Sequence, residues 1–198
     1  NFSIDSLLLK DMVDDTLIYV PRLSANFELM PLIRKGDINI HTVKLAEPDI
    51  RITRVTPDEP LNLQFLIDKF SSNDTTESVT PNIRIRQIHL YDGHVSYNVL
   101  SEPESEQFTT SHIDIDNLQA NMALRTLTAD TLSLYVRRIS FDEASGFSLK
   151  RLRAAVDASA NGATLTRLQV RLPGGEVTSK KITAKSDSIS TTFNGNIT

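Results

Sequence analysis

Four histidines are the side chains of this chain best suited to bind a metal ion, and two of them lie close together in the sequence. His89 and His94 flank a predicted turn at residues 91–93, so a hairpin there could bring their rings together. Zinc requires a third ligand and hydrogen bonds that orient the ligands, and the only nearby acid is Asp92 in the turn itself. We therefore interpret both histidines as exposed polar residues and expect neither a metal site nor a cofactor.

Three acidic pairs could in principle supply a general acid and a general base: Asp14 with Asp15, Asp114 with Asp116, and Asp142 with Glu143. Asp114 and Asp116 alternate with Ile113 and Ile115, which places them on the solvated face of a strand, where carboxylate pKa values stay ordinary. The third pair lies at the tip of a predicted reversal. There is also no GxSxG elbow, phosphate-binding glycine loop or zinc-protease helix. We expect no enzyme activity, and hydrolysis of an envelope polymer is a minor alternative.

The composition narrows the remaining classes of partner. The 198 residues include no cysteine, and 21 basic and 25 acidic residues spread along the chain give a formal net charge of −4. This balance offers no obvious surface for nucleic acid or for an anionic membrane. No run of about 20 apolar residues could span a bilayer. The chain begins inside an apolar repeat at Phe2, so we expect a single segment, residues 1–198, of a longer protein.

One apolar spacing, hxhxxhxh, recurs along the chain, where h is a hydrophobic and x a polar residue. The strands that it predicts must position the histidines and acids discussed above. At 39% hydrophobic residues only about 0.6 windows with four apolar h and four polar x positions are expected by chance, and four are present. Each half of the pattern is a strand with one apolar face, and the extra residue restores the phase, as a β-bulge does. The pattern, in six windows, occurs at residues 2–9, 38–45, 83–90, 113–120, 134–141 and 163–170.

Other signals complete the predicted fold. Turn residues at 47–49 and 91–93 predict hairpins within 38–55 and 83–99. Leu63, Leu66, Ile67 and Phe70 have helical spacing, which predicts one short helix at 61–70. The polar stretches at 71–82 and 101–111 are predicted to be mobile loops. The expected fold is mainly β, an elongated and curled antiparallel sheet with one short helix.

The apolar face of this sheet is the remaining candidate for a functional surface. It could be the core of a sandwich, or of a sheet packed on the 61–70 helix. Alternatively, the sheet is incompletely filled and its apolar side accommodates lipid tails, which need an unbroken apolar track. In that interpretation the groove is lined by Ile38, Ile40, Ile83, Ile85, Ile88, Ile113, Ile115, Leu118, Leu132, Leu134, Val136, Ile139, Leu165 and Leu168.

Four stretches, taken together and in this order, resemble a known family. They are PLNLQFLIDKF from Pro60, IRIRQIHLYDGHVSY from Ile83, HIDIDNLQANMALRTLTADTL from His112 and RRISFDEASGFSLKRL from Arg137. They resemble the TamB and AsmA-like superfamily, and more narrowly the N-proximal part of the TamB-type proteins of Bacteroides and its relatives. The resemblance extends from about Phe2 to Lys185.

The resemblance implies a repeating β-groove shaped like a taco shell. It also implies a periplasmic segment of a protein anchored in the inner membrane, with phospholipid acyl chains as its cargo between the two membranes. As an alternative, it implies a scaffold or chaperone-like module that assists outer-membrane protein assembly with an Omp85-type partner. The anchor helix and the partner-binding region of the family have no counterpart in this chain, so both contacts would be made elsewhere.

Overall fold

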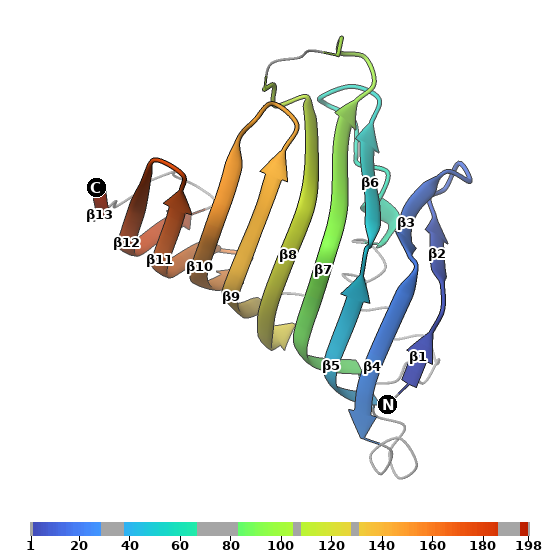
Figure 1. The fold of residues 1–198 in the computed structure, drawn as a ribbon, viewed down its shortest axis with the longest axis horizontal. Helices are drawn as coiled ribbons and strands as arrows, with labels where there is room; N and C mark the ends of the chain where they lie inside the picture. Colours follow the sequence, from blue (N-terminus) through green and yellow to red (C-terminus); the bar gives the residue numbers. More distant parts are fainter. Residues whose placement is uncertain are drawn as a thin grey trace.

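The computed structural model describes residues 2–28, 38–66, 83–104, 108–127, 131–185 and 195–197. These residues form one mainly β structure, a single open sheet of 13 strands with almost no helix. Figure 1 shows the strands side by side from β1 near the N-terminus to β13 near the C-terminus, with the longer strands bent at their lower ends. The predicted curled, mainly β fold is therefore confirmed.

The strands alternate in direction along most of the sheet, because residues 100–111 join β7 to β8 and short connections join consecutive strands from β8 to β12. Their bounds are β1 Phe2–Ile4, β2 Leu7–Lys10, β3 Thr16–Val20, β4 Arg22–Glu28, β5 Ile38–Ala46, β6 Asp49–Arg54, β7 Ile83–Val99, β8 His112–Leu127, β9 Thr131–Glu143, β10 Ser148–Ser159, β11 Gly162–Leu172, β12 Gly175–Lys185 and β13 Gly195–Ile197.

The prediction of hairpins within 38–55 and 83–99 is wrong. β7 runs through Asp92 and Gly93 as one strand of 17 residues, with a bulge between Leu90 and Val95. β5 and β6 do not pair with each other but lie end to end beside β7, and both are parallel to it. The turn-forming residues therefore make bulges instead of reversals, since Glu47 (φ 52°) and Asp92 (φ 51°) adopt the left-handed conformation within continuing strands.

These irregularities fall on one line across the sheet, which we call the kink line. It consists of the breaks at 5–6, 21 and 47–48 and the bulges at 92–93 and 116–117. The register holds them side by side: Ile4 lies opposite Leu23 below the line, and Leu7 lies opposite Val20 above it. The strands from β1 to β8 are thus interrupted or bulged at one level, which divides this part of the sheet into an upper and a lower part (Figure 1), and the strand register gives the corresponding level on β9 to β12.

Most of the predicted phase-restoring gaps are bulges. Register shifts occur at 41–42 against β4, at 116–117 against β9, at 137–138 against β8 and β10, and at 166–167 against β10. The gap at 5–6 instead separates β1 from β2. At 86–87 the register against β5 does not shift, because β5 has its own gap alongside at 41–42.

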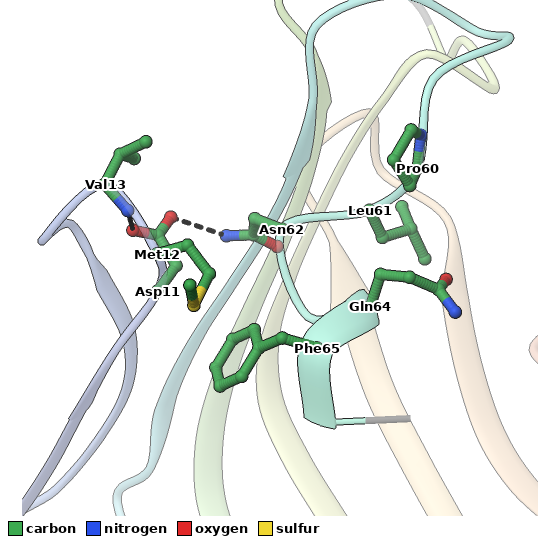
Figure 2. Close-up of a pocket in the computed structure, with 8 residues that line it drawn as sticks. All are labelled: Asp11, Met12, Val13, Pro60, Leu61, Asn62, Gln64 and Phe65. Atoms are coloured by element: carbon green, nitrogen blue, oxygen red, sulfur yellow. Dashed lines mark hydrogen bonds between the residues drawn. The ribbon is translucent and has the colours of Figure 1, made fainter. Parts of the chain in front are cut away.

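Above the kink line, the side chain of Asn62 forms hydrogen bonds along the edge of β6, and we call this group of bonds the polar staple. Asn62 accepts a hydrogen bond from Thr53 N (3.1 Å) and donates to Arg51 O (3.1 Å) and to an Asp11 carboxylate oxygen (3.4 Å). Figure 2 shows Asn62 between the β2–β3 turn and the segment that follows β6. A surface pocket of about 300 Å³ opens between the two segments, with Met12 and Phe65 in its wall. Residues 64–66 form one helical turn, and the rest of the predicted helix, 67–70, lies outside the described residues.

The described sheet is a single layer with a small core. Every pair of strands in extensive contact is a pair of neighbours in the sheet, so no described strand packs face to face on another. The largest fully buried side chains are Leu17, Val20 and Pro48, close to the kink line. Of the predicted loops, 71–82 lies outside the described residues, as do residues 105–107 of the second, and the ring of His112 bonds to Glu102 O in the described part of that loop and to Asn98.

Candidate functional site

An unbroken row of apolar residues crosses the whole sheet. Residues that are directly opposite in a sheet project from the same face. One such row, which we call the main ladder, contains one hydrophobic residue from each of the ten strands on the main path and no polar residue. The main ladder is Ile4, Leu23, Leu45, Leu90, Ala120, Ile139, Leu152, Val170, Val177 and Ile197.

Shorter apolar rows run beside the main ladder on the same face, which we call the apolar face. Below it are the rows Phe2, Ala25, Val43, Ile88, Met122, Val136 and Ala154; Leu124, Leu134, Val156, Leu165 and Ile182; and Leu132, Ala158, Ala163 and Ala184. At the lower end of β5 and β7 is Ile40 with Ile85; near the kink line is Leu118 with Gly93; above it are Ile115 with Val95 and Ile113 with Tyr97.

The structure thus brings twelve of the fourteen predicted lining residues to one face, and the side chains of the other two, Ile38 and Ile83, lie outside the described part of the chain. Leu168 joins them through its position two residues before Val170, opposite Ser179. Wherever their side chains are described, they are half-buried or buried, with Val136 only 5% exposed. Their side chains shield one another, although no second layer of described residues covers them.

Apart from Phe2 (49% exposed), the large hydrophobic side chains that are exposed lie outside these apolar rows. Most of them are in turns, at strand ends or on the two N-terminal strands, as are Met12 (79% exposed), Val13 (76%) and Leu100 (64%). The described apolar face therefore combines a continuous hydrophobic lining with incomplete burial. A lining of this kind can accept a further hydrophobic layer.

Sequence reasoning missed the contribution of β10 to this face. Leu152, Ala154, Val156 and Ala158 all occupy apolar rows, but the strand has register shifts on both sides of Leu152 and lacks the hxhxxhxh spacing. The simpler alternation from residue 152 to residue 158 was the available signal. Met122 and Leu124 were missed for the same reason, since they follow the end of the 113–120 window.

The opposite face, which we call the polar face, carries His89, His94, Asp114, Asp116 and Asp142, whereas Glu143 lies opposite Ile115 on the apolar face. His89 and His94 lie on the same strand instead of meeting across a hairpin, and both are half-buried, whereas exposed polar residues were expected. His94 Nδ1 lies 3.0 Å from Asp49 Oδ1, and its Nε2 lies 2.7 Å from Asp114 Oδ1. The hydrogen bond to Asp49, supported by Asp114, raises the pKa of His94. Both ring nitrogens are engaged, so neither is free to take a proton from a substrate.

The other acids of the predicted pairs have structural contacts. Asp114 and Asp116 are exposed on strand β8. Glu143 is buried and accepts hydrogen bonds from Ser145 N (2.9 Å) and Ser145 Oγ, and these bonds hold the pKa of its carboxyl below the ordinary value. The hydroxyl of Ser148, with Asn117, lowers the pKa of Asp142. Glu143 and Asp142 therefore stabilise the β9–β10 turn.

No cluster of three or more metal-ligating side chains occurs among the described residues. Within the same residues, no helix has the length and apolar character needed to cross a membrane.

Comparison with known proteins adds no relative: no family model, no curated protein and no solved structure matches the chain.

Proposed function

We propose that the apolar face shelters phospholipid acyl chains, so that this chain is a non-enzymatic, lipid-carrying segment of a longer envelope protein. The main ladder is the observation that supports this function best. Its register aligns hydrophobic residues on ten adjacent strands without a polar interruption. With a spacing of about 4.8 Å between strands, it extends for about 43 Å.

The dimensions and energetics suit a lipid. One leaflet supplies about half of the roughly 30 Å hydrocarbon core of a bilayer, so a track of this length exceeds an extended acyl chain. A two-chain lipid has about 30 methylenes, and exposing them to water costs on the order of 25 kcal/mol at about 0.8 kcal/mol each. A carrier must therefore cover the chains along their whole length. A long half-buried face does so better than a compact pocket such as the one beside Asn62.

The cellular setting of the proposal rests on the resemblance to TamB-type and AsmA-like proteins. In that setting the segment lies in the periplasm and belongs to a protein anchored in the inner membrane. It carries phospholipids between the inner and outer membranes, and an Omp85-type protein binds regions outside this chain. If the face served instead as a scaffold for outer-membrane protein assembly, its ligand would be a β-hairpin peptide and not a lipid.

Two adjacent residues of β11 allow a matched test. Leu165 lies on the apolar face between Val156 and Ile182, whereas Thr166 lies on the polar face opposite Lys181. Leu165→Asp and Thr166→Asp introduce the same charge into the same strand on opposite faces. Titration of the delipidated chain with a fluorescent fatty acid should give saturable binding that Leu165→Asp weakens at least tenfold and Thr166→Asp changes less than twofold.

Unfolding of the Leu165→Asp variant would imitate a binding defect, so thermal unfolding must be cooperative in both variants. Lipid extraction and mass spectrometry of the purified wild-type chain provide an independent measurement. Equal weakening by both substitutions, or an absence of both saturable fatty-acid binding and co-purified phospholipid, would contradict the proposed function. Saturable binding of an outer-membrane β-hairpin peptide without lipid binding would favour the scaffold function.

A further inference from the structure

Exposed basic and exposed acidic side chains occupy opposite ends of the strands. Below the kink line, exposed basic residues lie at positions far apart in the sequence. They are Lys44 on β5, Arg137 and Arg138 on β9, Arg167 on β11, and Lys180 and Lys181 on β12. Within the described residues none of the six forms an ion pair. A chain with an overall negative charge thus presents a cationic region on one part of its surface.

The strand register places Lys44, Arg138 and Lys181 of this region on the polar face. One row contains Lys44, His89, Asn121 and Arg138 on four adjacent strands. The next row ends at Lys181. From β5 to β12 the region extends for about 29 Å, at about 4.8 Å for each strand. Few acids lie near it. Of these, Glu176 is paired with Arg171 (3.3 Å), and Asp157 accepts a hydrogen bond from Ser133.

The histidine within this row reports the local charge. His89 lies between Lys44 and Asn121 in the register. Burial, together with the positive charges of Lys44 and Arg137, lowers its pKa. Side chains from β5, β7 and β9 therefore form one cluster, although they are separated by up to 93 positions in the chain.

The other end of the sheet has the opposite charge. Exposed acids at or above the kink line include Asp14, Asp58, Glu59, Glu102, Glu104 and Asp116. Several basic residues there are already paired: Lys10 with Asp14 (2.9 Å), Arg51 with Asp49 (2.6 Å) and Lys150 with Asp142 (3.7 Å). The sheet is therefore strongly polarised, and an anionic surface attracts its lower part and repels its upper part.

We propose that the lower polar face docks on the headgroup surface of an anionic phospholipid bilayer. The cations are distributed over two dimensions of an uncovered sheet face, as the charges of a membrane surface are, and do not follow a single line. Stacking of nucleic-acid bases needs exposed aromatic rings among the cations. In this region Tyr135 is half-buried and its hydroxyl accepts a hydrogen bond from Arg153 (3.1 Å). Docking in this orientation leaves the apolar face of the same strands accessible from the other side. The inference does not depend on the proposed acyl-chain binding.

The expected effect follows from the interaction of single charges with such a membrane. Each Lys or Arg near an anionic surface contributes about fivefold to the binding constant. Lys44 and Arg138 lie on strands three apart and share no partner, so removing both charges should weaken binding about 25-fold. Screening should weaken it further, because the Debye length falls from about 10 Å at 0.1 M salt to about 3 Å at 1 M.

Vesicle co-sedimentation of the whole chain tests the inference. The vesicles contain either phosphatidylcholine alone or phosphatidylcholine and phosphatidylglycerol in equal parts. The double variant Lys44→Gln/Arg138→Gln is compared with the control Lys10→Gln/Lys150→Gln, which loses the same charge from the upper part of the sheet. Surface ion pairs contribute little to stability, so both variants should remain folded, and circular dichroism checks this.

The inference is supported if the chain binds anionic vesicles and this binding is lost at 1 M salt. Lys44→Gln/Arg138→Gln should weaken the binding about 25-fold and the control Lys10→Gln/Lys150→Gln less than twofold. Equal weakening by the two variants, no binding to anionic vesicles, or equal binding to neutral vesicles overturns it. A single-stranded RNA oligonucleotide is the competitor. If it displaces the vesicles at an equal concentration of phosphate, the surface is one for nucleic acid and the inference is wrong. Failure of fatty-acid binding with intact vesicle binding would contradict the proposed function alone.

Discussion

Gly93 is the residue at which a single added methyl group should disturb the kink line most. It is buried in the β7 bulge, next to Asp92. A Cβ atom at this position would lie 2.6 Å from Leu90 Cδ2 and 3.1 Å from Pro48 Cγ, both closer than normal carbon–carbon contacts. Leu90 is 7% exposed and Pro48 is fully buried, so neither has free space into which to move. Gly93→Ala should therefore overpack the site.

Overpacking of a tight core by one methyl group costs about 1–3 kcal/mol. In a chain of this size, each kcal/mol lowers Tm by about 2–4 °C, so we expect a decrease of about 2–12 °C. Gly174→Ala is the matched control, because no atom lies within 4 Å of its added Cβ and its φ is not left-handed. Thermal and urea unfolding of the two variants would measure the difference.

A double-mutant cycle identifies the clash. Leu90→Ala removes the Cδ2 atom that the new methyl group would meet, so Gly93→Ala should cost less in the Leu90→Ala background than in the wild type. If Gly93→Ala and Gly174→Ala have equal stability within 0.5 kcal/mol, or if the cycle shows no coupling, the packing assigned to the kink line is wrong.

Two further predictions concern polar contacts above the kink line. Asn62→Ala leaves Thr53 N and Arg51 O without their partner at the edge of β6, so urea unfolding should show that the free energy of unfolding falls by about 1–3 kcal/mol. The control Asn161→Ala, in the exposed β10–β11 turn, should lower it by less than about 0.5 kcal/mol. Equal losses in the two variants would exclude the stabilising role of the Asn62 hydrogen bonds. Because Asp49 and Asp114 raise the pKa of His94, its contribution to stability is complete below the ordinary pKa of 6.5 and is lost as the pH rises through the higher folded value. The difference in Tm between wild type and His94→Gln should therefore shrink between about pH 6 and pH 8, and a difference that grows over this range would contradict the assigned ion pairs.

The sequence predicted the apolar face more successfully than the path of the chain. Period-two alternation from Ile113 to Phe141 determines which side chains share a face, and the phase-restoring gaps were correctly predicted as bulges at 116–117 and 137–138. These signals are local, since a strand of either direction has the same alternation. For that reason most of the lining residues were identified without any knowledge of which strands are neighbours.

The strand connections were not predictable from the same signals. Pro48 with Asp49, and Asp92 with Gly93, are typical of turns, but Val95 and Tyr97 continue the apolar face of β7 beyond the bulge. The parallel pairing of β5 with β7 depends on a connection of more than 20 residues, and local periodicity carries no information about its path. The charge separation was missed for a related reason. Whether Lys44 and Arg138 lie at the same end of the sheet depends on strand directions and register, so an even distribution along the sequence conceals a polarised surface.

The absence of cysteine from the chain makes one measurement especially direct. Single cysteines can be placed at Ile88 and Ile139 on the apolar face, and at Asn121 and Thr166 on the polar face, and their reaction rates with a water-soluble maleimide compared with and without phosphatidylcholine, whose neutral headgroup the cationic region does not attract. If acyl chains lie along the apolar face, saturating lipid should slow the first two reactions at least tenfold and leave the second two within twofold. Equal rates at all four positions with and without lipid, or protection of the polar face alone, would contradict an acyl-chain track on this sheet.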